Sequence, residues 1–351
     1  MPISWRRFGR GSGMTGLIEL VSPHVLRERH LLLVPSTVTQ EEVGELVRAR
    51  VRGSNLAVHG EVKLGRHSRL TGPYEMTMED AVDAAVPMPW TVAYAFHAPV
   101  EREDPPLPGA DDRDGFAASF PDGLPWREEG RGLHLLVALA RRLHGAVRVV
   151  GGPLVHPDPD RALDLIVHSP QWLEPDVVLG LVQRVLPTAH LAVEGEEWDG
   201  PSPEAYSGAV ILRDTAHDPL RPGELASLHH VADDHDMDAL RGEDVIDAFA
   251  VVADMGPMAA DGALEVLVHV TEPGDAAVAD QEWGEHPFVS YEIRWSCPEP
   301  DERERRLPSA SYLASRERVR PHIGAVAHVL VEAVAGVVVD EDGFWVDRYA
   351  L

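Results

Sequence analysis

Two segments of the chain, residues 139–155 and 330–346, align without a gap at an offset of 191 residues. Their sequences are LARRLHGAVRVVGGPLV and LVEAVAGVVVDEDGFWV. The alignment pairs Leu139 with Leu330, Gly145 with Gly336, Val147 with Val338, Gly152 with Gly343 and Val155 with Val346. Self-similarity at a long offset predicts an internal duplication, and it restricts the folds open to the chain more than any single motif does.

Each segment has the pattern of a helix that ends before a strand, a turn and a second strand. Apolar residues recur at helical spacing before each glycine, at Leu133, Leu136, Val137, Ala140 and Leu143 and at Ile323, Val326, Ala327, Leu330, Val331 and Val334. Gly145 and Gly336 are expected to end the helices in the left-handed conformation, which glycine adopts without strain. A tight turn containing Gly152 or Gly343 then separates two predicted strands.

Further segments have the pattern of strands. Residues 92–99 and 289–298 precede the two main helices, and residues 162–168 (ALDLIVH) resemble residues 263–269 (ALEVLVH). Alternating apolar residues predict that these strands are half-buried. Residues 162–195 read as strand, helix and strand, with Pro175 near the helix start and Pro187 beyond its end. We also predict a strand at 206–214 and helices at 223–232 and 243–255.

Strands and helices mix in this chain without strict βαβ alternation. This favours an α+β protein with two related halves, each a largely antiparallel sheet covered by helices on one face. A doubly wound parallel sheet is the alternative. Two charged segments, 101–115 and 298–308, occupy corresponding places before the main helices, and we predict that both are surface loops.

The length of 351 residues exceeds what one hydrophobic core usually organises. We assign residues 1–16 to a flexible basic N-terminal arm and residues 17–158 to a first α+β domain. Residues 159–351 form the second predicted domain, which includes the strand-helix-strand region and the second repeat.

Charge and cysteine content restrict the compartment and the partners. The formal net charge of −27 argues against duplex nucleic acid and anionic membranes, because both require a basic surface. The single cysteine, Cys297, and the absence of an apolar leader favour the cytoplasm. Lys63 is the only lysine, a bias that indicates a GC-rich source. The N-terminal segment is a local exception to this acidic charge, because it contains Arg6, Arg7 and Arg10. We interpret it as a flexible tail, with a nucleic-acid contact as the alternative.

One short stretch, LHHVADDHDMD at 228–238, concentrates histidine and aspartate. If a helix continues into the early 230s, His229 with Asp233 and His230 with Asp234 are neighbours four residues apart. These pairs, completed by His235, would offer a mixed nitrogen and oxygen shell to a divalent transition metal such as zinc, manganese or iron. The alternative is an acidic surface between two helices, in which the histidines pair with nearby carboxylates.

Other candidate groups are weaker. His168 and Ser169 are adjacent on a predicted strand, so their side chains should point to opposite faces and fail to form a dyad. His168 and His269 are expected to be sheet-surface histidines. Cys297 lies at the end of a predicted strand and is not expected to act as a nucleophile. The chain also lacks a phosphate-binding loop with lysine, a G-x-S-x-G elbow and an H-E-x-x-H helix.

These observations favour a non-catalytic cytoplasmic binding or regulatory protein that acts through a partner protein or a small ligand, with no cofactor predicted. The alternative is a metal-dependent hydrolase that uses the cluster at 229–235. The sequence does not decide the oligomeric state.

Overall fold

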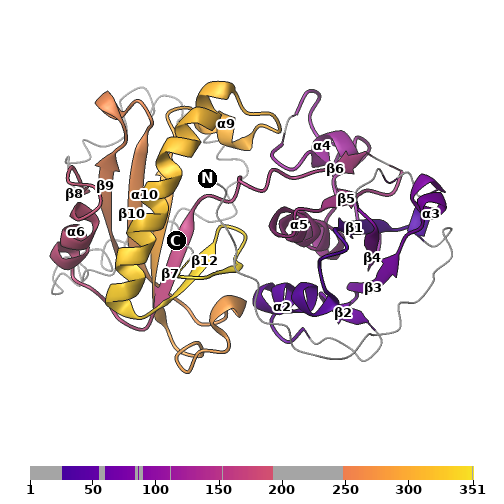
Figure 1. Cartoon of the computed structure of the whole chain (residues 1–351), viewed down its shortest axis with the longest axis horizontal. Coiled ribbons are helices and arrows are strands. Elements are labelled where there is room, and N and C mark those ends of the chain that lie inside the picture. The colour runs from indigo at the N-terminus through magenta and orange to yellow at the C-terminus, as the bar shows by residue number, and fades with distance from the viewer. Residues whose placement is uncertain are drawn as a thin grey trace, which may run out of the picture.

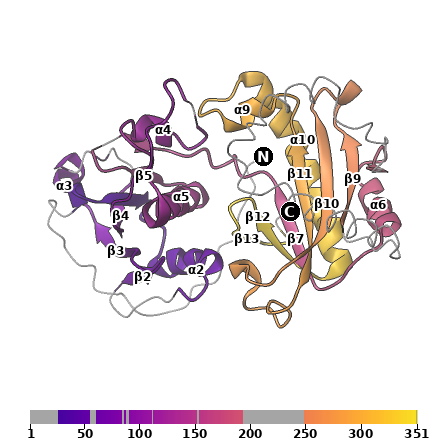
Figure 2. The same cartoon turned by 180° about the vertical axis from the view of Figure 1, so that it is seen from behind.

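A computed structural model describes residues 26–54, 60–83, 86, 90–110, 112–151, 153–192, 248–349 and 351. In these ranges the chain forms two antiparallel sheets with helices packed against them, as the α+β prediction requires (Figures 1 and 2). The first sheet lies within residues 30–155, called the first lobe here, and the second within residues 165–346, the second lobe. The predicted domain boundary at residues 158 and 159 stays a prediction.

The first sheet has six strands in the order β2-β3-β4-β1-β5-β6. Its strands are β1 (His30–Val34), β2 (Glu61–Lys63), β3 (Arg69–Glu75), β4 (Val92–His97), β5 (Ala146–Arg148) and β6 (Leu154–Val155). Its helices are α2 (Gln40–Arg50), α3 (Met78–Asp83), α4 (Phe116–Ser119) and α5 (Arg127–Arg142).

The second sheet has seven strands in the order β13-β12-β7-β11-β10-β9-β8. Its strands are β7 (Leu165–Ser169), β8 (His190–Leu191), β9 (Ala248–Asp254), β10 (Ala263–Thr271), β11 (Phe288–Ser296), β12 (Val337–Asp340) and β13 (Trp345–Val346). Its helices are α6 (Pro175–Gln183), α9 (Pro300–Glu304) and α10 (Ala310–Val334), with single 3₁₀ turns η1 (Pro257–Ala259) and η2 (Ala276–Val278). No described helix combines the length and the apolar character that a bilayer crossing demands.

The strand order of the first sheet recurs in the second when β1 is matched with β7, β4 with β11 and β5 with β12. The pairing register also agrees. One row across the first sheet consists of Val155, Val147, Leu32 and Tyr94. The row in the same place of the second sheet consists of Val346, Val338, Val167 and Tyr291. Two of these pairs, Val147 with Val338 and Val155 with Val346, are the pairs that the sequence alignment gave.

The two main helices bury the faces that their periodicity predicts. Every residue of the two predicted apolar faces is buried, in α5, in α10 and at Leu143, which directly follows α5. The helix α10 lies along one face of the second sheet (Figure 1), and α5 contacts β1 and β5 of the first. The prediction of helices on one face is wrong for the first sheet, because Ala81 of α3 belongs to the hydrophobic cluster on the opposite face, which also contains Leu31 and Leu33.

Gly145 and Gly336 do follow the two helices, but the expected reason is wrong. The left-handed residues are the preceding ones, His144 with φ 53° and Ala335 with φ 49°. The glycines are needed for space instead, because each backbone passes close to a carbonyl group of the neighbouring strand. The turn at Gly343, with φ 76°, is as predicted, whereas Gly152 lies outside the described residues.

Two predicted helix and loop assignments are wrong. Residues 248–254, placed in a helix at 243–255, form strand β9 between β8 and β10, because pairing on both sides outweighs an ambiguous apolar run. The segment 298–308, predicted as a loop, contains α9. The similar segments 162–168 and 263–269 both belong to the second sheet, on either side of β11, so their likeness reflects a shared strand pattern.

Candidate functional site at the junction of the lobes

The turn between β12 and β13, residues 340–344, joins the second lobe to the first. Phe344 is fully buried and belongs to the hydrophobic core of the first lobe, although its chain neighbours pair within the second sheet. The turn is closed by the amide groups of Gly343 and Phe344, which donate to the carbonyl and the carboxylate of Asp340 at 2.8 and 2.9 Å. This local closure presents the acidic residues of the turn to the first lobe.

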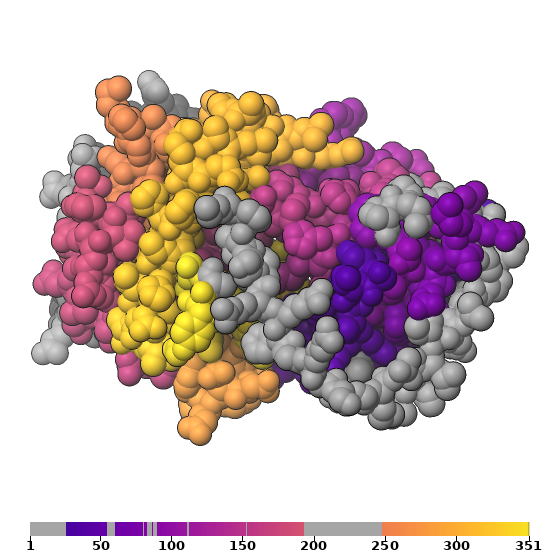
Figure 3. All heavy atoms as spheres, viewed as in Figure 1, coloured from indigo at the N-terminus to yellow at the C-terminus, as the bar shows by residue number. Residues whose placement is uncertain are grey.

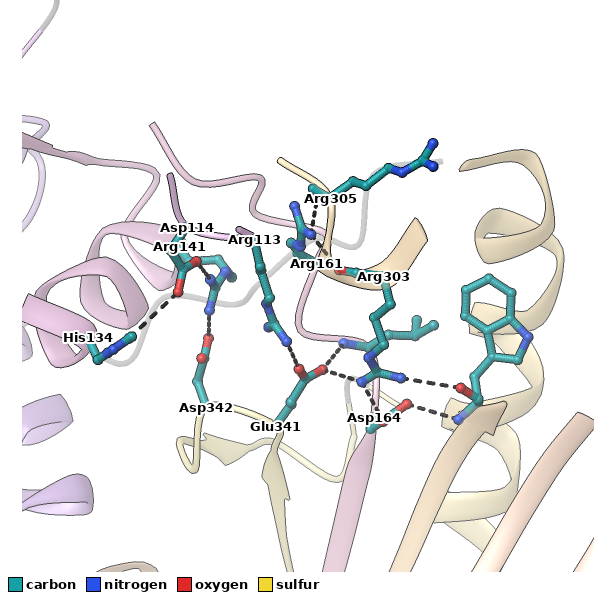
Figure 4. A network of polar contacts seen from close by, with 12 residues as sticks. Arg113, Asp114, His134, Arg141, Arg161, Asp164, Arg303, Arg305, Glu341 and Asp342 are labelled. Carbon is teal, nitrogen blue, oxygen red and sulfur yellow. Dashed lines mark hydrogen bonds and ion pairs between the residues drawn. The ribbon is translucent and has the colours of Figure 1, made fainter. Parts of the chain in front are cut away.

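Two arginines of the first lobe form ion pairs with carboxylates of this turn (Figure 4). Arg113 forms an ion pair with Glu341, and Arg141 forms one with Asp342. Arg141 also contacts Asp114 at 3.0 Å, and its side chain is only 4% exposed. Removing one partner of an ion pair that is screened from water costs more free energy than removing a partner of an exposed pair, because the other charge is left buried and uncompensated.

A second arginine reaches Glu341 from the other side. Arg303 of α9 donates to Glu341 at 2.9 Å and to Asp164 at 2.6 Å, so Glu341 lies between Arg113 and Arg303 (Figure 4). Arg161 in turn donates to the backbone carbonyls of Arg303 and Arg305. In Figure 3 the atoms of the segment after residue 300 extend toward the first lobe.

The electrostatics keep these groups charged. Burial opposes ionisation of Glu341, but the charges of Arg113 and Arg303 lower its pKa below the usual range. Burial likewise opposes ionisation of Asp114, and a hydrogen bond from His134 with the charge of Arg141 lowers its pKa. Asp164 differs, because burial raises its pKa despite the nearby Arg303.

A cavity of about 540 Å³ opens beside this network. Its walls come from the end of α2, the loop at 64–68, one face of α5 and the turn residues Glu341 and Asp342. Both lobes therefore contribute to it, and its volume lies in the range of small-molecule sites. A second hollow of about 400 Å³ adjoins it and shares Glu128 and Arg131 with it.

The sequence-predicted metal residues lie outside the described part of the chain. They are His229, His230, Asp233, Asp234 and His235, within the segment 193–247. Among the residues that the structure does describe, no group of three or more histidine, cysteine or acidic side chains is placed to hold a metal ion. The metal hypothesis for 229–235 therefore stays a prediction.

His168 and Ser169 point to opposite faces of the second sheet, as predicted. The Nδ1 atom of His168 lies 2.9 Å from the Ser290 hydroxyl, whereas Ser169 donates to the Val334 carbonyl. His168 is only 3% exposed, so its prediction as a sheet-surface residue is wrong, and burial lowers its pKa. His269 is partly exposed and contacts Glu292 at 3.0 Å.

Cys297 was predicted at the end of a strand, and it comes directly after the last residue of β11, where it is buried. Burial raises the pKa of its thiol, which disfavours the thiolate that a nucleophile requires.

The sequence interpretation missed the residues that join the lobes. Arg113 and Asp114 end one charged segment, and Arg303 lies within the other, and both segments were interpreted as surface loops. Their corresponding places before α5 and α10 were the available signal, since equivalent loops of two related sheets can meet at a shared junction. Charge alone did not distinguish them from solvated loops.

Comparison of the chain with protein-family models, with curated proteins and with solved structures found no match.

Proposed function

We propose that this chain is a non-catalytic binding protein that holds a small ligand in the cavity between its two lobes. The observation that carries the proposal is the cavity of about 540 Å³ with walls from both lobes. Sites of this size at the junction of two structural units are where small ligands commonly bind.

The surrounding ion pairs support a role in binding rather than in chemistry. The carboxylates of Asp114 and Glu341 have their pKa values lowered by neighbouring groups, so they are poor proton acceptors near neutral pH. Their arginine partners fix the shape of the wall before a ligand arrives, which reduces the ordering cost of binding.

We also infer that the two lobes are copies of one ancestral unit. The shared strand order and the matching rows through Tyr94 and Tyr291 support this inference. In this view each copy contributes a different part to the junction, α5 from the first and the β12–β13 turn from the second. The ligand site would be a product of the duplication, because neither copy alone has all of its walls.

The proposal is tested by thermal unfolding of the full chain with a defined panel of carboxylates, phosphate esters, nucleotides, amino acids, sugars and polyamines. Ligands that bind the native state raise the midpoint of unfolding. We expect at least one class to do so, and we expect Ala138→Trp, which fills the cavity from α5, to abolish the effect. Ala118→Trp, at an exposed position of α4 outside the cavity, is the matched control.

Two results would overturn the proposal. One is a panel in which no compound gives a shift that Ala138→Trp removes. The other is conversion of a bound compound to product by the purified protein, lost on substitution of a single residue, because this would show catalysis.

A further inference from the structure

The carboxylates that line the cavity all have hydrogen-bond or ion-pair partners, whereas some of its arginines do not. All four of its carboxylates already have partners: Asp114 and Asp342 contact Arg141, Glu341 contacts Arg113 and Arg303, and Glu128 accepts from the His67 amide at 2.8 Å. Hydrogen bonds from this loop also lower the pKa of Glu128, although burial opposes them. The carboxylates therefore offer little to a cationic ligand.

The arginines of the cavity divide into two groups. Arg113 and Arg141 are used by the junction. Arg50 and Arg131 also line the cavity, yet neither makes a hydrogen bond or an ion pair within the described part of the chain. Both are exposed to solvent, so a ligand can reach them.

The Arg50 side chain lies close to the second lobe. A Cβ atom at Gly343 would lie 2.6 Å from Nη1 of Arg50 and 2.9 Å from its Cδ. The absence of a side chain at Gly343 thus lets the Arg50 side chain lie against the β12–β13 turn. A guanidinium group from α2 thus lies at the junction of the lobes, with no ion pair or hydrogen bond to a described residue.

The adjoining hollow also contains arginines without close partners. It shares Arg131 with the main cavity and adds Arg66, His67 and Arg127. The Arg66 side chain has no partner among the described residues, and Arg127 has only an exposed contact with Glu101 at 3.7 Å. Three guanidinium groups without close partners, those of Arg50, Arg131 and Arg66, therefore line two connected hollows.

We propose that the ligand of the cavity is a small organic polyanion, whose carboxylate or phosphate groups bind Arg50 and Arg131. This inference rests on the proposed function. Guanidinium groups bind both kinds of oxyanion through paired hydrogen bonds, and unpaired arginines are the chemistry that selects them. Two hollows that share Arg131 fit a ligand with more than one anionic group better than a single small anion.

The test is calorimetric titration of the full chain at constant ionic strength. The probes are citrate and inorganic pyrophosphate as polyanions, acetate and inorganic phosphate as single anions, and spermidine as a polycation. We expect citrate, pyrophosphate or both to bind. Citrate should bind at least tenfold more tightly than acetate, and pyrophosphate at least tenfold more tightly than phosphate. Spermidine should not compete with the polyanion that binds. Citrate without pyrophosphate would identify carboxylate recognition, and the reverse would identify phosphate recognition.

Variants connect the binding to the named residues. Arg50→Gln and Arg131→Gln should each weaken polyanion binding at least tenfold. Arg48→Gln is the matched control, because Arg48 lies on the same helix as Arg50 but not in the cavity wall, and it should change the affinity less than twofold. Circular dichroism of each variant checks that the fold is retained.

The outcomes separate this inference from the proposed function. Binding of a neutral or cationic compound that Ala138→Trp abolishes and that Arg50→Gln and Arg131→Gln leave unchanged would overturn the polyanion inference alone. Polyanion binding that Ala138→Trp does not affect would place the polyanion outside the cavity and overturn this inference, and the proposed function as well if no other compound gives a shift that Ala138→Trp removes. No binding by any probe or panel compound would also overturn both.

Discussion

Gly145 and Gly336 have the same environment in the two lobes. A Cβ atom at Gly145 would lie 2.2 Å from the Leu33 carbonyl oxygen, and one at Gly336 would lie 2.4 Å from the His168 carbonyl oxygen. Leu33 and His168 lie in the corresponding central strands β1 and β7. Each glycine therefore allows the chain to leave its main helix and to approach the sheet more closely than any other residue permits.

This relationship predicts that Gly145→Ala and Gly336→Ala each destabilise the protein. A methyl group in either position must push the backbone away from a carbonyl group, at a cost of about 1–3 kcal/mol. Chemical unfolding with urea measures the change. Gly180→Ala is the control, because this exposed glycine of α6 has open space around it and alanine favours helix by up to about 1 kcal/mol. Wild-type stability in either of the first two variants would contradict the packing argument.

The burial of Phe344 in the core of the first lobe predicts that the two lobes unfold together. Because this side chain is fully buried in the core of the first lobe, Phe344→Ala should cost about 3–5 kcal/mol. Hydrogen exchange should show faster exchange in α5 as well as in the β12–β13 hairpin that carries the residue. Tyr349→Ala, which removes an aromatic side chain that is 80% exposed, is the matched control. Loss of protection in the hairpin alone would mean that Phe344 does not couple the lobes.

Local structure at this junction could be predicted from the sequence, but the junction itself could not. The turn at Gly343 and the buried faces of α5 and α10 follow from glycine spacing and helical periodicity. One partner of Glu341, by contrast, is Arg113, which is 228 residues away in the chain. Such a pairing depends on how the two sheets meet, and hydrophobic periodicity carries no information about that.

The error at β9 has a similar origin. The run AFAVVAD at 248–254 is short and apolar, and such runs fit a helix or a strand equally well when they are considered alone. Its neighbours β8 and β10 decide the outcome by providing hydrogen-bond partners on both edges. Phe344 illustrates the same limit, since its place in a strand hairpin gives no sign that it packs into the other lobe.

The metal hypothesis for residues 229–235 makes its own prediction. If His229 and Asp233 chelate a cation, desalted protein should retain about one equivalent of zinc or manganese. The double variant His229→Ala and Asp233→Ala should then lose it. Elemental analysis measures the metal content directly. Protein that contains no transition metal and shows no thermal shift with zinc or manganese would exclude both the metal site and the hydrolase that depends on it.

Asp340 predicts a pH dependence of stability. Burial raises the pKa of its carboxyl group to about 6, although the Phe344 amide and Arg142 oppose the shift. The unfolded chain has a pKa near 4 at this position, so the folded state binds the proton more tightly. The contribution of this group to stability is therefore complete below about pH 4 and is lost as the pH rises through 6.

A non-titrating asparagine at position 340 does not lose stability in this way, and its side-chain oxygen can still accept a hydrogen bond from the Phe344 amide. We expect the free energy of unfolding of Asp340→Asn to rise relative to wild type between pH 4 and pH 6, by about 3 kcal/mol at most, and the difference to be constant above pH 7. Urea unfolding at pH 4, 5, 6 and 7 measures this difference, and Asp347→Asn corrects for the loss of one exposed carboxylate in the same region. A difference that is independent of pH, or that falls as the pH rises, would show that the carboxyl group of Asp340 is not held with a raised pKa at the junction.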